Sequence, residues 1–157
     1  MRRKEKEITD QKIIDEILTK SQLCRIALFD DEFPYIVPFN YAYSDNVILF
    51  HSATSGKKID LIRKNNKVCF EIEYSSQIIE HEQSCQWTTR YRSIIGVGVM
   101  EIVTEYEEKK KGLDAIMTHY GRTEHTDYGG KSLENLVILK LKILNLTAKQ
   151  SGNWEKE

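Results

Sequence analysis

A phosphate-binding motif can be read in residues 50–60 of the sequence. A strand-like apolar stretch ends at Ser52, small and hydroxyl residues follow as far as Gly56, and Lys57 and Lys58 then begin a predicted helix. The free N–H groups of a first helical turn, hydroxyl groups and ammonium groups all favour an anion. The segment therefore predicts a phosphate site, and a capped surface helix with solvated lysines is the alternative that the local pattern leaves open.

The motif differs from the Walker A loop that binds nucleoside triphosphates. When the pattern G-x-x-x-x-G-K-[ST] is aligned on Gly56, its first glycine falls at His51. Lys58 also stands where the pattern requires a serine or threonine. The sequence therefore disfavours a triphosphate and is more compatible with a single phosphate group.

Two other segments carry side chains that suit a flat ring. Residues 38–43 put aromatic groups and the Asn40 amide on the strand before the motif, where a heteroaromatic ring could lie; packing of a barrel interior is the alternative. Residues 87–93 put Arg90 and Arg92 beside two aromatic residues, which suits a phosphate or a stacked ring. A polar strand start with solvated charges would explain this second segment equally well.

The sequence contains no motif that indicates metal-dependent or nucleophilic catalysis. His81 and Cys85 have a spacing that can share a metal ion on a helix, but the residues between them give no zinc signature and further ligands are missing. No G-x-S-x-G elbow and no Ser/His/Asp order is visible. The three cysteines are odd in number and include no C-x-x-C pair, so we expect neither a disulfide framework nor a metal site.

The composition is that of a single globular domain. The chain has 157 residues, 23 basic and 24 acidic side chains and a formal net charge of -1, so it has no overall attraction for nucleic acid. No apolar run approaches the ~20 residues that span a membrane. The charged stretch Met1 to Glu7 is followed by no apolar segment, so we expect no signal peptide and a cytoplasmic protein.

The pattern of apolar residues and turns predicts mainly β structure. We expect six strands, at residues 23–29, 35–43, 47–52, 68–73, 93–103 and 137–148. Helices are expected near the N-terminus, after a cap at Thr9 or Asp10, and at 57–64 and 105–120, with loops at 74–86 and 121–131. Short turns between the first three strands and glycines within the fifth favour an antiparallel β-barrel with peripheral helices.

Taken in order, several segments resemble one known superfamily. They are residues 24–28, 34–41, 50–53, 56–58 and 91–98, the last of which runs into Glu101. The set resembles the FMN-binding split-barrel superfamily that includes pyridoxamine 5'-phosphate oxidase, and within it the nitroimidazole-resistance (Nim) branch. The resemblance implies a homodimeric, six-stranded antiparallel split β-barrel with peripheral helices. Residues 1–157 would form one FMN-binding domain, with an N-terminal helix in 1–20 and a C-terminal tail at 150–157.

The resemblance also implies a set of cofactor contacts, with two FMN molecules at the dimer interface. Pro38, Phe39, Asn40 and Tyr41 would lie along the isoalloxazine ring, and His51 and Ser52 would approach the flavin or its ribityl chain. Gly56, Lys57 and Lys58 would bind the phosphate. Arg92 and Ser93 would come from the partner subunit, and Arg90 and Tyr91 flank them as further cofactor-binding candidates.

Two departures disfavour a true pyridoxamine-phosphate oxidase. The oxidase carries Arg-Lys where this chain has Lys57 and Lys58, and its arginine- and histidine-rich C-terminal substrate signature is absent from 151–157. The resemblance implies instead an FMN-dependent oxidoreductase that reduces a small electron-poor substrate, such as a nitroimidazole or another nitroaromatic, with NAD(P)H as electron donor. The flavin would carry the redox chemistry, and His51 would donate a proton or orient the substrate.

Three alternatives remain open on the sequence. A non-catalytic flavin- or haem-binding stress protein could share the fold, and haem would need His51, His81, His119 or His125 as axial ligand. A deazaflavin (F420) enzyme would keep the phosphate motif but would need a longer basic groove, which is not visible. A dimeric structural domain that binds nothing is the third alternative.

Overall fold

The strands of the chain form one antiparallel sheet. The computed structural model describes residues 3–122, 124 and 128–154. Within them the sheet runs in the order β3-β2-β6-β7-β8-β5-β4, and β1 pairs with β8. The strands are β1 (Glu7–Ile8), β2 (Cys24–Leu28), β3 (Tyr35–Phe39), β4 (Tyr41–Ser44), β5 (Val47–Ala53), β6 (Lys67–Ile79), β7 (Thr88–Val103) and β8 (Leu136–Ser151). The prediction of a mainly β, antiparallel fold is confirmed.

The described sheet has eight strands where the sequence predicted six, for two reasons. The predicted strand 35–43 is divided at Asn40, because β3 pairs with β2 whereas β4 pairs with β5. The short β1 is added because Glu7 and Ile8 pair with the far end of β8. β3 and β4 are therefore the two ends of the sheet path, and no ladder of hydrogen bonds joins them to close a barrel.

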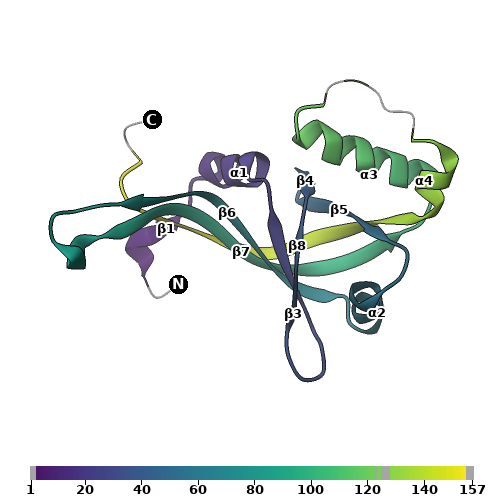
Figure 1. The fold of residues 1–157 in the computed structure, drawn as a ribbon, viewed down its shortest axis with the longest axis horizontal. Coiled ribbons are helices and arrows are strands. Elements are labelled where there is room, and N and C mark those ends of the chain that lie inside the picture. Colours follow the sequence, from purple (N-terminus) through teal and green to yellow (C-terminus); the bar gives the residue numbers. More distant parts are fainter. Residues whose placement is uncertain (1–2, 123, 125–127, 155–157) are drawn as a thin grey trace.

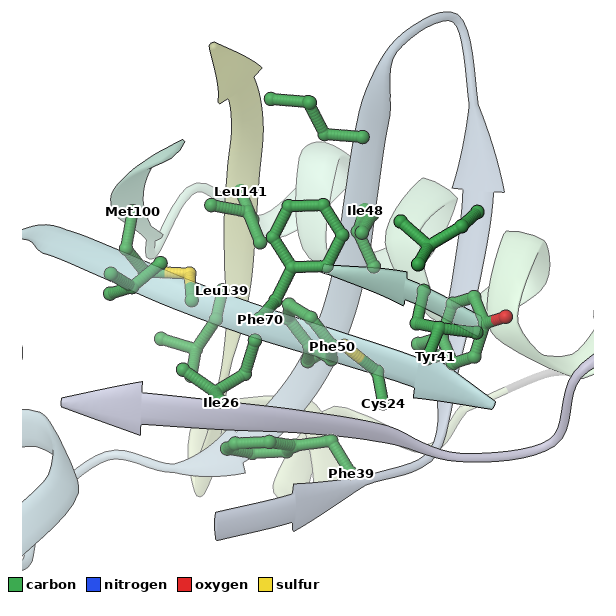
Figure 2. Packing of buried hydrophobic residues seen from close by; sticks show 14 of the residues in the cluster. Cys24, Ile26, Phe39, Tyr41, Ile48, Phe50, Phe70, Met100, Leu139 and Leu141 are labelled. Atoms are coloured by element: carbon green, nitrogen blue, oxygen red, sulfur yellow. The ribbon is translucent and has the colours of Figure 1, made fainter. Parts of the chain in front are cut away.

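The sheet curls around a core to which both of its ends contribute. Figure 2 shows side chains from central and terminal strands, such as Ile26 of β2 and Leu139 of β8, pointing into one shared interior. Phe39 of β3 meets Phe50 of β5, with ring centroids 5.0 Å apart. Burial of these apolar faces is the main force that bends the sheet.

Among the described residues, four α-helices lie around the sheet: α1 (Gln11–Lys20), α2 (Lys57–Lys64), α3 (Tyr106–His119) and α4 (Gly130–Glu134). Helices α1 and α2 bury apolar faces in the main core, and α3 packs over β4, β5 and β8 (Figure 1). The Asp10 carboxylate accepts from the Lys12 N–H at 2.9 Å and so caps α1, one of the two caps predicted. Helix α2 has the predicted bounds, and α3 agrees with its prediction to within one residue at each end.

Helix α4 lies partly in a segment predicted to be a loop. It is short, and its support is tertiary: the buried Lys109 of α3 donates hydrogen bonds to the carbonyl oxygens of Leu133 and, at 3.3 Å, Leu136. Such long-range support leaves no periodic signal in the sequence. The rest of the predicted loop includes residues 123 and 125–127, and hence His125, which lie outside the described residues.

The predicted loop at 74–86 is wrong in its first part, because β6 continues through residues 74–79, and β7 begins five residues before its predicted start at Ser93. β6 runs to Ile79 and β7 begins at Thr88, with a 3-10 turn, η2 (Ser84–Gln86), between them. The resulting hairpin projects well beyond the rest of the sheet (Figure 1). Its side chains are mostly polar and exposed on both faces, so the alternation that marks a half-buried strand is missing.

No helix within the described ranges is long and apolar enough to cross a lipid bilayer.

We predict that Gly98→Ala destabilises the fold. Gly98 lies beside a bulge in β8, and a Cβ there would overlap the carbonyl oxygen of Lys142 and the side chain of Leu141. Overpacking of this kind costs about 1–3 kcal/mol, which urea unfolding would measure. Gly129→Ala is the control, because its Cβ would meet nothing within 4 Å. Equal stabilities of the two variants would contradict the close approach of β7 and β8.

Candidate functional site

The start of helix α2 presents free backbone donors. Gly56 precedes the helix with φ 111°, in the region that favours glycine, and no side chain caps the helix. The Gly56 carbonyl oxygen accepts from the N–H groups of Ile59 at 2.9 Å and Asp60 at 3.2 Å. The N–H groups that come before these two have no partner within the helix, which is the usual condition of an anion-binding helix start.

The two lysines of α2 have different surroundings. Lys57 Nζ lies 2.7 Å from Asp30 Oδ2, and this hydrogen-bonded ion pair raises the pKa of Lys57 and lowers the pKa of Asp30. Lys58 Nζ lies 5.2 Å from the centroid of the Phe39 ring and forms no ion pair within the described residues. Lys58 is therefore the cation more available to a ligand, and Lys57 already shares its charge with a carboxylate.

Ser52 has a buried hydroxyl without a partner. The residue is 3% exposed, and its Oγ finds no hydrogen bond among the described residues. It ends the buried face of β5 and comes four residues before Gly56. A buried polar group left unpaired costs free energy, so a ligand oxygen at this place would be stabilised by Ser52 as well as by α2. These residues therefore fit a phosphate group.

His51 and Ser52 point to opposite faces of β5. Successive side chains of a strand alternate between faces, and here Ser52 shares the buried face with Phe50 while His51 is exposed. One ligand can meet both only where it passes the end of the strand. Other histidines are engaged: His119 Nε2 lies 2.8 Å from the Ser21 carbonyl oxygen, and His81 Nδ1 accepts from the Gln83 N–H at 3.1 Å.

The segment predicted to lie along a ring is divided between core and surface. Phe39 is 7% exposed and Tyr41 is fully buried, with its hydroxyl donating to the Leu18 carbonyl oxygen at 2.8 Å. Pro38 and Asn40 are exposed. β3 also ends the sheet path, so one of its backbone edges pairs with no strand in the part of the chain that the structure describes. What this segment offers a ligand is that edge with Pro38 and Asn40, while the Tyr41 side chain serves packing.

The segment 90–93 is likewise divided between the two faces of β7. Ile95 and Val97 are exposed whereas Ile94 and Gly96 are buried, so alternation puts Tyr91 and Ser93 on the outer face and Arg90 and Arg92 on the inner side.

Arg92 is engaged by its own chain. Its side chain is 11% exposed, its Nη1 lies 3.0 Å from Glu16 Oε2, and its guanidinium carbon lies 4.1 Å from the Trp154 ring centroid. Arg90 contacts the same ring at 4.8 Å and donates to Gln77 Oε1 at 3.0 Å. Both arginines thereby hold the C-terminal segment against β7, and Arg92 also holds α1.

A single chain does not bring the two ends of the predicted site together. The Met100 N–H donates to the Asn66 carbonyl oxygen at 2.8 Å, which fixes the α2 end of β7. Arg92 comes eight residues earlier in the same strand, roughly 26 Å away at the usual rise of a strand. The phosphate motif and the segment 90–93 can therefore serve one small ligand only if they come from different copies.

Some neighbours of the site were not predicted from the sequence. Asp30 was placed in a turn, and Glu16 and Trp154 were assigned no role, yet they contact Lys57 and Arg92. Each contact joins residues far apart in the chain, so no local spacing could have indicated it. Within the described ranges, no group of three or more His, Cys, Asp or Glu side chains is placed to hold a metal ion.

Comparison with known proteins identifies the family. The model of the family described as pyridoxamine 5'-phosphate oxidase matches residues 10–150. The fold is thus that of the FMN-binding split-barrel superfamily, and the chain belongs to the pyridoxamine 5'-phosphate oxidase family, as the ordered segments indicated.

Two solved structures and one curated protein illustrate the similarity. A candidate 5-nitroimidazole antibiotic resistance protein from Bacteroides thetaiotaomicron VPI-5482 has a TM-score of 0.81 and 29% identity, over 92% of this chain and 86% of that one. The FAD and haem binding protein from Mycobacterium smegmatis has a TM-score of 0.81 and 22% identity, over 97% and 76%. An uncharacterised protein of Rhizobium meliloti (strain 1021) is 37% identical over 83 residues, 50% of each chain, so this chain spans about half the length of that relative.

We predict that Glu16→Gln lowers stability at neutral pH by about 1 kcal/mol, because it removes the charge that meets Lys20 and Arg92. The Lys20 ammonium, followed by Arg92, lowers the pKa of the Glu16 carboxyl from its ordinary 4.5. Its contribution is therefore complete above that value and is lost as the pH falls below it. Unfolding free energies from urea titrations should differ between parent and variant at pH 7, and the difference should shrink as the pH falls below 4.5 and the Glu16 carboxylate of the folded protein takes up its proton.

The matched control is Glu101→Gln, an exposed carboxylate of β7 that forms no ion pair within the described residues. It should leave the stability unchanged at both pH values. A Glu16→Gln variant as stable as the parent at pH 7 would show that the link between α1 and Arg92 contributes nothing.

Proposed function

We propose that this chain is an FMN-dependent oxidoreductase that acts as a homodimer on a small electron-poor substrate. The observation that carries the proposal is the buried, unpartnered Ser52 hydroxyl four residues before the uncapped start of α2. A phosphate there would accept a hydrogen bond from Ser52 Oγ, meet the N–H groups that follow Gly56 and attract Lys57 and Lys58. FMN ends in a single phosphate, which is the group that these residues suit.

The remaining contacts would position the ring. The unpaired edge of β3, with Pro38 and Asn40, would lie along the isoalloxazine, while Phe39 and Tyr41 hold this edge from the core. When bound, FMN supplies the hydride- and electron-transfer chemistry of its ring. The chain's own work would then be to bind the phosphate, fix the ring against β3 and leave one ring face open to substrate.

A homodimer would complete the site and cover an apolar surface. The outer face of the sheet exposes Ile36 (61%), Ile95 (55%), Val97 (47%) and Leu144 (62%). Exposed apolar side chains gathered on one sheet face are typical of an interface. Docking of a second copy on this face would bring its Tyr91 and Ser93 toward the cofactor, whereas Arg90 and Arg92 would support them from behind.

The substrate we propose is a nitroimidazole or another nitroaromatic, with NAD(P)H as electron donor. The similarity at 29% identity to a candidate 5-nitroimidazole antibiotic resistance protein supports this choice. His51, exposed on β5, would donate a proton to the substrate or orient it. The single-domain organisation over 1–157 and the cytoplasmic location expected from the sequence stay predictions.

The cofactor can be tested directly on the purified protein. We expect flavin absorbance bands and, after denaturation, release of a molecule with the mass of FMN. Lys57→Ala combined with Lys58→Ala should weaken FMN binding at least tenfold, which corresponds to about 1.4 kcal/mol, because both ammonium groups would neutralise the phosphate.

Lys64→Ala is the matched control for this titration. Lys64 lies at the other end of the same helix and forms an ion pair with Asp31 at 2.7 Å. It should leave FMN affinity unchanged. A Soret band without flavin bands would favour haem, a released FAD would correct the cofactor, and a protein that stays colourless after addition of FMN would refute the proposal.

We predict that His51→Asn slows nitro-group reduction by at least about tenfold, because a positioned proton donor commonly contributes more than this to rate. The flavin spectrum and the affinity for FMN should not change, since the phosphate contacts stay intact. Steady-state reduction of a nitroimidazole, followed at saturating NADH, gives the rate. An unaltered rate with full flavin content would remove His51 from the reaction.

A further inference from the structure

The β6–β7 arm, residues 76–91, is a part of the chain that the proposed function leaves unused. Strand β8 supports β7 only as far as the pair Tyr91 and Ser151. Beyond this pair the arm is a two-stranded ribbon, closed at its tip by a hydrogen bond of 2.7 Å from Trp87 Nε1 to the His81 carbonyl oxygen. A two-stranded ribbon alone is marginally stable in water, so an ordered arm needs a surface to pack on.

The outer face of the arm continues the outer face of the sheet. Ile78 pairs with Thr89, and paired residues of neighbouring strands share a face. Thr89 lies on the same face of β7 as Ile95, because residues two apart in a strand point the same way. Ile78 is 66% exposed and Trp87, near the tip, is 50% exposed. The exposed apolar side chains Val97, Ile95 and Ile78 therefore share one face of β7 and β6, which we call the strip, with the half-buried Ser93 and Tyr91 and the exposed Thr89 between Ile95 and Ile78.

The direction of this strip relative to the proposed dimer indicates which molecule covers it. The proposed dimer places the outer face of β7 at residues 91–95 against the cofactor groove of the second copy. The arm extends the same strand beyond that groove, since Thr88 comes seven residues before Ile95, roughly 23 Å along the strand. A second copy that covers Ile95, Ser93 and Tyr91 therefore lies in the direction in which the arm exposes Ile78.

We propose that the β6–β7 arm packs across the second copy of the chain, with Ile78 buried against it. By the symmetry of an isologous dimer, each arm would reach past its partner's cofactor groove and pack on the partner's surface beyond it, so that two equivalent arm contacts hold one dimer together. This inference rests on the proposed dimer, and it goes further by assigning the arm as the part that holds the two copies together.

The first test places a probe at the arm tip. Cys85 is exposed, Cys24 is buried and Cys69 is half-buried, so Cys69→Ser leaves Cys85 as the accessible thiol. A benzophenone maleimide on Cys85 of the whole protein, mixed from ¹⁴N- and ¹⁵N-labelled chains, should give crosslinks between differently labelled subunits on illumination. The matched control is Glu107→Cys with Cys85→Ser and Cys69→Ser, which puts the probe on exposed α3 and should give none.

The second test removes the apolar contact itself. Ile78→Asp should weaken the dimer at least tenfold in sedimentation, because a carboxylate would have to be buried against the partner. The control is Tyr106→Asp, a side chain 49% exposed at the start of α3, where the dimer constant should not change. Circular dichroism of both variants checks that the chain remains folded.

The outcomes separate this inference from the proposed function. A flavin-containing dimer whose Cys85 probe reacts only within its own chain, or whose dimer constant is indifferent to Ile78→Asp, overturns the arm contact and leaves the proposed function intact. A chain that stays monomeric at every concentration overturns both. Crosslinks between subunits, together with a weaker dimer of the Ile78→Asp variant, support the contact between the arm and the second copy.

Discussion

The packing of Phe39 against Phe50 constrains everything else in this molecule. Phe39 comes from β3 at one end of the sheet path and Phe50 from β5, next to the strand at the other end, so their contact keeps the sheet curled around a core that its own side chains fill. A close-packed interior has no room for a cofactor. A ligand is therefore restricted to the rim of the curled sheet and its outer face, which is where α2, the free edge of β3 and the exposed side of β7 lie.

The charges at this rim are balanced rather than strongly basic. Lys57 shares its charge with Asp30, and Lys64, at the far end of α2, is paired with Asp31. Lys58 forms no such pair within the described residues and lies over the Phe39 ring. Selectivity for a phosphate would then come less from net charge than from directed donors: the Ser52 hydroxyl, the first N–H groups of α2 and one ammonium group. A site of this kind discriminates by geometry, and salt would weaken it only in part.

Local signals and long-range contacts explain which features the sequence could predict. Helices α1, α2 and α3 were predicted because each carries its own evidence in the form of a cap or a periodic apolar face. The motif at the start of α2 was visible for the same reason. The hairpin of β6 and β7 was missed because it buries neither face, and α4 was missed because Lys109, more than twenty residues away, supports it.

The site residues are divided between the two faces of their strands, and the sequence could not predict this division either. Resemblance gave residues 38–41 and 90–93 as two runs of ligands, but strand alternation assigns neighbouring residues in each run to different tasks. Tyr41 serves the core and Asn40 the surface; Arg92 holds α1 while Ser93 faces outward. A match between two sequences does not predict this division, because it contains no information on which way each side chain points.

One consequence of this division is thermodynamic. In the proposed dimer, the face of β7 that completes the cofactor groove is also the face whose apolar side chains need to be covered. A ligand that contacts both copies binds the dimer better than the single chain, and it must then stabilise the dimer by the same free energy. Dimerisation and cofactor binding would be coupled through Ser93 and Tyr91, whereas Arg92 on the other face is held by Glu16 and Trp154 of its own chain. The inner face of β7 would thus serve the stability of the single chain, and its outer face would serve dimerisation and cofactor binding.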